Sequence, residues 1–375
     1  MAKNINELPI TEIVERARKL ARAGENTLEK IRGIAQDVYC RDIPSKYDWN
    51  FLIASSSIES IDQYKTGTVS INTGSRIASF SSDVTVTDAM AGRLIKFTGN
   101  DVVYSVNSYM TAQSLQILPP LRGPNNISSA TYSIFQPYFA LAYDFDRFPK
   151  DGGVYKWEGG AKKRLSEKSY QDFTDDYQST PSNPDNIRII SADTAGNTRI
   201  EFTPAPAYAR IYGYDYIKSL KPLNETTAGT LSSISAKATS VVGNSNTRFL
   251  DAYANGSSNL WFRADALGVG QDSQWYPIIL ITTDSALTLG VAFANSAITS
   301  SANYTISKAP EMPVRLHPGV LYGTLMQLAL DQNDDSAQVY YNQYASVLSD
   351  AKRIHVSRSY STEFKTIAED IKYRV

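Results

Sequence analysis

Two hydrophobic patterns alternate along this chain of 375 residues, and their order predicts its domains. At both ends apolar residues recur every three or four positions, which is typical of amphipathic helices; Leu321, Leu325 and Leu328 form one such stripe. Between the ends apolar and polar residues alternate, which is typical of strands. The expected domains are N-terminal helices (1–62), a first β-module (64–136), a mixed α/β segment (137–221), a linker with a second, repeated β-module (222–310), a C-terminal helical hairpin (314–353) and an extended arm (354–375).

Two stretches of the alternating region are near copies of each other, 172 residues apart and without a gap. The first copy contains Tyr104-Ser-Val106, Leu115-Gln-Ile117 and Ser128-Ser-Ala-Thr-Tyr132, and the second contains Tyr276-Pro-Ile278, Leu287-Thr-Leu289 and Ser300-Ser-Ala-Asn-Tyr304. A match at fixed separation indicates one structural module used twice. The alternation predicts that each copy is built of antiparallel strands.

The two helical ends each have an apolar face that neither can bury alone, so we expect them to pack together. The predicted fold class is therefore α+β, with a helical layer from the N- and C-terminal helices and two inserted antiparallel β-sandwich or barrel modules. Residues 48–53 are expected to form a short third helix. Residues 222–248 are rich in Ser, Thr, Ala and Gly, which predicts a linker that enters the second module.

Composition narrows the class of protein. Hydrophobic residues make up 42% of the chain, enough for packed cores throughout. The formal net charge of −1 argues against a general nucleic-acid binder, which would carry a large basic excess. The single cysteine, Cys40, rules out an intrachain disulfide and favours folding in a reducing cytoplasm. The sequence has neither a long apolar run nor a signal-peptide pattern, so no membrane association is expected.

No motif for catalysis, a cofactor or a metal is apparent. The two histidines, His317 and His355, belong to different predicted elements and lack metal-ligand spacing. Phosphate-binding and nucleophile-elbow motifs are absent. The carboxylate pair Asp144 and Asp146 has no surrounding motif that would set two different pKa values. The sequence therefore predicts a protein that is not an enzyme and holds no cofactor or metal.

Two groups of basic residues are candidate interaction sites. Lys162, Lys163 and Arg164 form a cluster that is either a solvated turn or a phosphate contact on a DNA path. The end of the chain is locally basic and poor in core residues, so it is either disordered or an arm that docks on a partner. The candidate docking residues are Lys352, Arg353, Arg358, Lys365, Lys372 and Arg374.

Aromatic residues in the second β-module allow two interpretations. Trp261, Phe262, Trp275 and Tyr276 lie on alternating strand patterns, where core packing is the ordinary role. If they were exposed, they could instead stack on a sugar or contact a receptor.

In order along the chain, these pieces resemble a family of virion proteins. The first module carries Gly67-Thr-Val69, Gly92-Arg-Leu94-Ile95, Tyr104-Ser-Val106 and Ser114-Leu115. The middle carries Tyr138-Phe-Ala-Leu141-Ala-Tyr143-Asp144-Phe145, Leu165-Ser166, Pro184, Ile200-Glu-Phe202-Thr-Pro204-Ala-Pro206 and Ile211-Tyr-Gly-Tyr214-Asp-Tyr216. The closing hairpin carries Tyr344, Leu348 and Lys352-Arg353. This ordered set covers most of the chain and resembles the head-to-tail adaptors of tailed bacteriophages, also called connector, neck-ring or tail tubular A proteins.

The resemblance implies a structural virion protein, made in the host cytoplasm, that forms a ring, commonly twelve-fold, beneath the portal protein. Genome DNA would pass through the ring without sequence-specific contacts, and a tail or nozzle protein would lie below. The C-terminal arm would reach the portal. The second β-module is a departure from the simplest adaptors and leaves open a receptor- or carbohydrate-binding virion module. An enzyme, such as a tail-associated depolymerase, is the third hypothesis, disfavoured because no carboxylate pair has supporting context.

Overall fold

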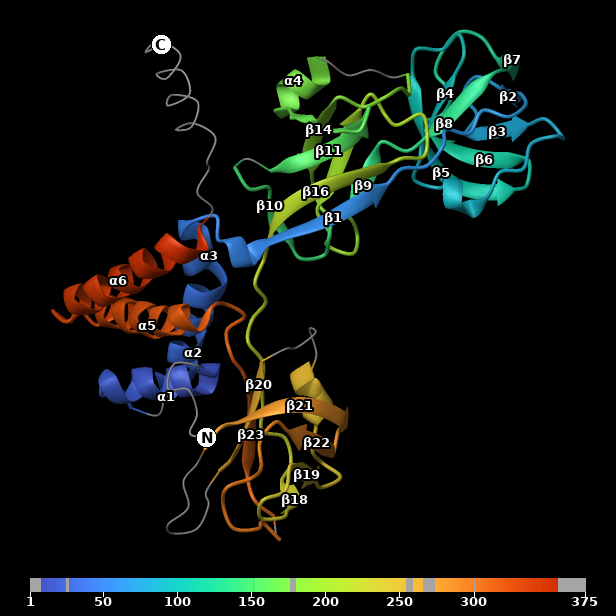
Figure 1. Cartoon of the computed structure of the whole chain (residues 1–375). Helices are drawn as coiled ribbons and strands as arrows, with labels where there is room; N and C mark the ends of the chain where they lie inside the picture. The colour runs from blue at the N-terminus through green and yellow to red at the C-terminus, as the bar shows by residue number, and fades with distance from the viewer. Residues whose placement is uncertain are drawn as a thin grey trace, which may run out of the picture. The chain divides into compact units, whose positions relative to one another are not determined.

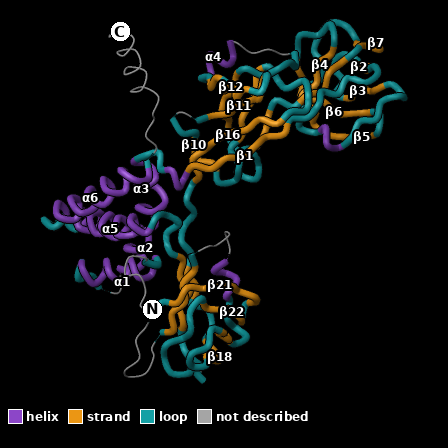
Figure 2. The backbone as a smooth tube through the Cα atoms, in the orientation of Figure 1, coloured by secondary structure: helices purple, strands orange, loops and turns teal. Residues whose placement is uncertain are grey.

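The computed structural model describes residues 8–24, 27–150, 152–175, 180–253, 259–265, 274–299 and 301–356 (Figure 1). The chain is an α+β protein whose sheets are almost entirely antiparallel. It divides into two compact units, one made of residues 1–52 and 219–375 and the other of residues 53–218. Figure 2 shows that helices gather in the first unit, while strands build nearly all of the second.

The main helices of the first unit come from both ends of the chain. They are α1 (Ile10–Leu20), α2 (Leu28–Asp37), α3 (Ile43–Lys46), α5 (His317–Asp331) and α6 (Ala337–His355), with a π-helical turn at Val38–Asp42. α1, α2 and α5 contact one another, and α6 packs on α5 (Figure 1). On α1 the buried residues Ile13, Val14 and Ala17 follow the helical stripe that the sequence shows.

Polar contacts join the two ends of the chain across about 300 residues. Tyr344 donates a hydrogen bond to the Asp42 carboxylate, and the amide of Glu311 donates to the Tyr39 hydroxyl. The amide of Leu8 donates to Nδ1 of the buried His317, so Nε2 carries the proton and donates to a backbone carbonyl. N-terminal and C-terminal segments therefore bury one another.

The helical expectation is wrong at residues 53–59. The chain leaves a single 3₁₀ turn at Asn50–Leu52 and forms strand β1 (Ile53–Glu59). β1 pairs along its whole length with β16 (Ile211–Lys218). Seven residues of ladder pairing outweigh the weak local helical preference.

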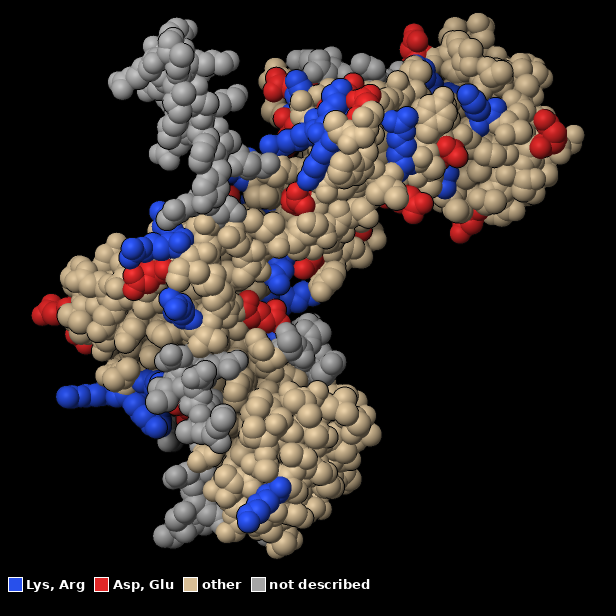
Figure 3. Space-filling view, viewed as in Figure 1, with Lys and Arg blue, Asp and Glu red and all other residues tan. Residues whose placement is uncertain are grey.

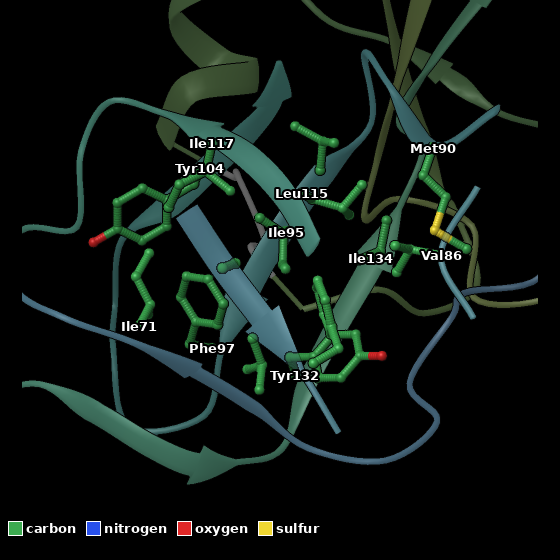
Figure 4. Close-up of a cluster of buried hydrophobic side chains, with 14 of the residues drawn as sticks. Ile71, Val86, Met90, Ile95, Phe97, Tyr104, Leu115, Ile117, Tyr132 and Ile134 are labelled. Carbon is green, nitrogen blue, oxygen red and sulfur yellow. The ribbon is translucent and has the colours of Figure 1, made fainter. Parts of the chain in front are cut away.

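The first β-module is one seven-stranded sheet. Its strands are β2 (Val69–Ile71), β3 (Ile77–Phe80), β4 (Leu94–Phe97), β5 (Val103–Thr111), β6 (Ser114–Leu118), β7 (Ile127–Ala130) and β8 (Tyr132–Phe135), in the order β7-β2-β3-β6-β5-β4-β8. β7 and β8 are consecutive in sequence yet lie at opposite ends of this order, so the sheet curls around its core. Ile95, Phe97, Tyr104 and Leu115 fill that core and are fully buried (Figure 4).

The second β-module has the same plan. Its strands are β17 (Glu225–Thr226), β18 (Leu231–Ile234), β19 (Ser240–Gly243), β20 (Leu260–Ala264), β21 (Tyr276–Thr283), β22 (Ala286–Leu289) and β23 (Tyr304–Lys308), in the order β17-β23-β20-β21-β22-β19-β18. The linker interpretation of residues 222–248 is wrong over β18 and β19. Those strands supply Leu231, Ile234 and Val241 to the core.

The two modules share their pairing register. In the β5–β6 hairpin the partners are Val106–Ile117, Ser108–Gln116, Tyr109–Leu115 and Thr111–Ser114. In the β21–β22 hairpin they are Ile278–Leu289, Leu280–Thr288, Ile281–Leu287 and Thr283–Ala286. These four pairs, and both register shifts, recur 172 positions later. Identical bulges in both copies show that the repeat extends to backbone geometry.

The start of each module also corresponds, at a separation of 162. Gly67 and Gly229 both have left-handed φ values, 70° and 80°, and each is followed by Thr. The Tyr132 hydroxyl donates to the Thr66 carbonyl, and that of Tyr304 donates to the Ala228 carbonyl. The separation between matching residues of the two modules is 162 at their start and 172 from Tyr104 and Tyr276 onward. A gapless sequence comparison therefore misses the first part of each module.

The remaining strands of the second unit form two small sheets. They are β9 (Tyr138–Ala140), β10 (Phe145–Arg147), β11 (Gly153–Glu158), β12 (Ala161–Arg164), β13 (Ser166–Glu167), β14 (Asn186–Ile190) and β15 (Arg199–Thr203), with one helix, α4 (Tyr170–Asp175). One sheet runs β1-β16-β11-β12 with β10 also on β16, and the other runs β13-β14-β15-β9. Aromatic residues such as Phe139, Phe202 and Tyr212 fill the core between them.

Replacing either matched glycine, Gly67 or Gly229, with alanine should destabilise its β-module. A Cβ at Gly67 would lie 2.4 Å from Val84 Cγ2, and one at Gly229 would lie 2.6 Å from the backbone N of Thr247. We expect a cost of about 2–4 kcal/mol, from left-handed strain plus overpacking, with the larger loss at Gly229 because backbone cannot yield. Gly74→Ala is the control, since Gly74 also has a left-handed φ but open space around it; strain alone should cost about 1–2 kcal/mol. Urea unfolding measures all three, and equal losses would refute the packing account.

Candidate functional site

The predicted basic cluster lies on the β11–β12 hairpin of the second unit. The turn is Gly159-Gly160, with left-handed φ values of 59° and 83° that suit a tight two-residue connection. Cross-strand partners are Tyr155–Arg164, Lys156–Lys163 and Trp157–Lys162. Because side chains alternate along a strand, Lys162 and Arg164 share one face, and Lys163 lies on the other.

One face, formed by Tyr155, Trp157, Lys162 and Arg164, is called here the aromatic–basic face. Nζ of Lys162 lies 3.4 Å from the centroid of the Tyr155 ring and 3.2 Å from the Asp215 carboxylate. The Trp157 side chain is 60% exposed. Arg164 is exposed, and none of the described residues supplies it with an acceptor.

Two glycines make room for this face. A Cβ on Gly213 would lie 2.5 Å from the Tyr155 ring, and one on Gly153 would lie 2.9 Å from Nε of Arg164. Neither position could carry a side chain without displacing its neighbour. The glycines therefore let Tyr155 and Arg164 lie flat across the sheet.

The opposite face of the hairpin holds a compact charge network. The side chain of Lys156 is only 2% exposed, and its Nζ donates to the Pro184 carbonyl at 2.8 Å and to Asp185 at 2.9 Å. Nζ of Lys163 lies 3.4 Å from Glu158 and 3.6 Å from Asp185. The hydrogen bond from Lys156 holds the pKa of Asp185 below its ordinary value. Lys163 is thus compensated by carboxylates of its own unit.

The geometry therefore divides the predicted cluster rather than joining it. Basic and acidic side chains are intermixed over this part of the chain (Figure 3). Strong binding to a polyanion needs several cations free to meet phosphates, whereas Lys162 and Lys163 already face carboxylates. The role of these residues on a DNA path stays a prediction.

The candidate docking residues of the C-terminus lie partly within the described chain. Lys352 is placed with its Nζ 4.5 Å above the Tyr47 ring, and Arg353 is exposed. α6 continues to His355 and Val356 bridges Trp49, so residues 354–356 of the predicted arm belong to the helical unit. Arg358, Lys365, Lys372 and Arg374 lie outside the described residues.

The aromatic residues that suggested sugar binding are core residues. Trp261, Phe262, Trp275 and Tyr276 are all buried, none more than 8% exposed. The Trp275 indole donates to Glu12 of α1, and Arg263 stacks on its ring while contacting Glu15 and Asp265. This cluster fastens the second β-module to α1. These four side chains therefore cannot form an exposed sugar platform.

The described residues contain no group of His, Cys, Asp and Glu able to hold a metal ion. Burial lowers the pKa of His317, consistent with its neutral, hydrogen-bonded ring. Burial, with Asp37 nearby, raises the pKa of the Cys40 thiol to about 11, which makes it a poor nucleophile. The Asp144 carboxylate accepts a hydrogen bond from Tyr216. Among the described helices, none has the length and apolar character to cross a membrane.

A groove that the sequence did not predict lies between α2 with its π-helical turn and α5. Its volume is about 500 Å³. The lining residues are Ile34, Asp37, Val38, Arg41, Asp42, Ser45, Gln327 and Asp331. Ile34 and Val38 supply apolar surface to the groove. Three carboxylates (Asp37, Asp42 and Asp331) and one guanidinium (Arg41) also line it. No single motif could reveal it, because its residues meet only when the two chain ends pack.

A scan of protein-family models finds no match to this chain, and a search of curated proteins finds no significant match either.

Removing the Asp185 charge should destabilise the second unit at neutral pH. Asp185→Asn leaves the buried Lys156 ammonium without its nearest carboxylate, and because Asp185 is 60% exposed we expect about 1–2 kcal/mol. A depressed carboxyl pKa adds stability above the unfolded value of 3.8, and this stability is lost as pH falls through the folded value. The difference in free energy of unfolding between wild type and variant should be constant from about pH 5 to 7 and should shrink as the pH falls below about 4. Urea unfolding at several pH values measures it.

Glu158→Gln is the matched control, since its carboxylate lies 4.0 Å from the same Nζ. We expect a change of under about 0.5 kcal/mol. A loss as large as that of Asp185→Asn would contradict the assignment of Asp185 as the principal partner.

Proposed function

We propose that the chain is a structural protein of a tailed-bacteriophage virion, the head-to-tail adaptor that forms a ring beneath the portal. The observation that carries the proposal is the ordered architecture: helices from both chain ends bury one another, and all β-structure is inserted between them. The helices would form the layer that packs around the ring, from which both β-modules project.

The surface of α6 supports packing against other protein. Between Asp335 and Asp350 the helix carries no charged residue. Only Tyr344, Leu348 and Ala351 of α6 are buried, so much of this uncharged surface is exposed, including Val339 and Tyr341. An exposed helix face ordinarily carries charge. A ring that places α6 against the neighbouring copy would account for the lack of charged residues on this surface.

The partners in this proposal are the portal above, a tail or nozzle protein below, copies of the same chain, and genome DNA held without sequence preference in the lumen. A formal net charge of −1 suits close packing of identical copies, because large like charges would repel. The alternative of a receptor- or carbohydrate-binding module loses its main motivation with the four aromatics buried.

The copy number in the virion tests the proposal directly. Quantitative mass spectrometry of purified virions should find this chain close to one copy per portal subunit. Hundreds of copies would point to a tail-tube or capsid-surface protein. Absence from virions would point to an assembly factor or an enzyme.

Removing residues 357–375 should weaken portal binding without unfolding the chain. The cut lies after Val356, so α6 and its bridge to Trp49 stay intact. We expect unchanged circular dichroism and melting, and at least about tenfold weaker binding to purified portal if the arm supplies a main contact. Equal affinity in the truncated protein would reject the docking arm while leaving the ring proposal standing.

A further inference from the structure

The aromatic–basic face is built as a contact surface rather than as part of a core. Trp157 is 60% exposed, and its ring meets Tyr155 edge-on with the centroids 6.1 Å apart. Trp, Tyr and Arg are the residue types that dominate binding energy at protein interfaces. The face combines all three on a rigid two-stranded hairpin with a tight turn.

Its charge favours a protein partner over DNA. Lys162 is already held by Asp215 and the Tyr155 ring, so of the two cations on this face only Arg164 has no partner among the described residues. Binding to duplex DNA would need several free cations, and an intact base stack admits a large apolar side chain only if the duplex is unstacked and kinked. A protein surface with an apolar pocket beside a carboxylate would use both Trp157 and Arg164.

The groove between α2 and α5 has that chemistry. Ile34 and Val38 provide apolar wall, and Asp37, Asp42 and Asp331 outnumber the single Arg41. Asp37 is paired with Arg41 at 3.4 Å, but its side chain is 69% exposed, so its carboxylate has room to accept a second guanidinium. A volume of about 500 Å³ lies in the range of pockets that take compact ligands, about 300–1,000 Å³, and so admits an indole.

We propose that the aromatic–basic face of one copy docks in the α2–α5 groove of a second copy, with Trp157 in the groove and Arg164 against Asp37. The hairpin and the groove are different surfaces of the same chain. Because two different surfaces meet, the contact is heterologous and leaves one groove and one hairpin free at the ends of each assembly. Repetition of this contact builds a ring or a filament. The proposal involves neither portal nor DNA, so it stands or falls separately from the virion role.

The affinity of this contact comes chiefly from burying Trp157. The charges fix how the two copies are oriented relative to each other. The groove carboxylates lie near local cations, Asp42 with Lys46 at 2.9 Å and Asp331 with Lys30 at 3.0 Å. Exposed pairs of this kind contribute little on their own. Exchanging them at an interface sets specificity more than strength.

Self-association of the full chain, measured by sedimentation velocity over a concentration series, tests the contact. Trp157→Ala and Arg164→Glu should each raise the concentration of half-association by about tenfold or more. Tyr208→Ala removes another aromatic that is 61% exposed, and Arg76→Glu reverses another exposed cation of the same unit. Both controls should associate like wild type.

A charge exchange distinguishes a direct contact from a structural effect. Asp37→Arg alone should weaken association, and Asp37→Arg combined with Arg164→Glu should restore it at least in part. Failure of the combined variant to recover, or wild-type association by both single variants, would overturn the proposal.

Carbodiimide crosslinking of an equal mixture of ¹⁴N- and ¹⁵N-labelled chains locates the contact. We expect Lys162 joined to Asp37 or Asp331, with mixed-isotope peptide pairs. Crosslinked peptide pairs that always carry the same isotope would place the contact within one chain and refute the proposal. A chain that stays monomeric at every concentration would refute it as well. Salt-sensitive binding to duplex DNA that Arg164→Glu abolishes, with association unchanged, would assign the face to DNA instead.

Discussion

Each β-module depends on one segment that serves both ends of its own sheet. In the first module β7 pairs with β2 and β8 pairs with β4, so residues 127–135 join the first edge to the last. In the second module β23 pairs with β20, while Ala302 and Ile298 bridge Leu231 and Ile234 of β18. An open seven-stranded sheet would leave two rows of unpaired amide and carbonyl groups. Curling the sheet onto this segment pairs part of those rows and encloses the core.

The two copies differ most where the second meets α1. Lys96, Val103 and Phe135 of the first module correspond, by register and by the separation of 172, to Arg263, Trp275 and Ser307 of the second. These three replacements supply the contacts to Glu15, Glu12 and Thr11 of α1. The second β-module is thus a docked part of the helical unit. The first β-module is instead joined to the middle sheets of the second unit.

The sequence could reveal features that depend on neighbouring residues, but not those that depend on contacts between residues far apart in the chain. The repeat from Tyr276 onward was visible because it has no gap, whereas the matching Gly229-Thr230 start was hidden by a shift in separation. β1 was missed because its strand pairing is supplied by β16, more than 150 residues away. The basic cluster was seen as three adjacent residues, but strand alternation sends Lys163 to the other face. The groove required residues near 37 and near 331 to meet, which no local pattern encodes.

Several cations of the described chain are used within the fold. Lys156 is buried against Asp185, Lys352 lies over Tyr47, and Arg263 is enclosed by carboxylates and an indole. Two of the surfaces that remain exposed carry few charges: the side of α6 around Val339 and Tyr341, and the face around Trp157. Such surfaces gain more from contact with another ordered protein than from contact with a polyanion. A chain whose formal net charge is only −1 can approach other protein closely, because close approach then costs little electrostatic repulsion.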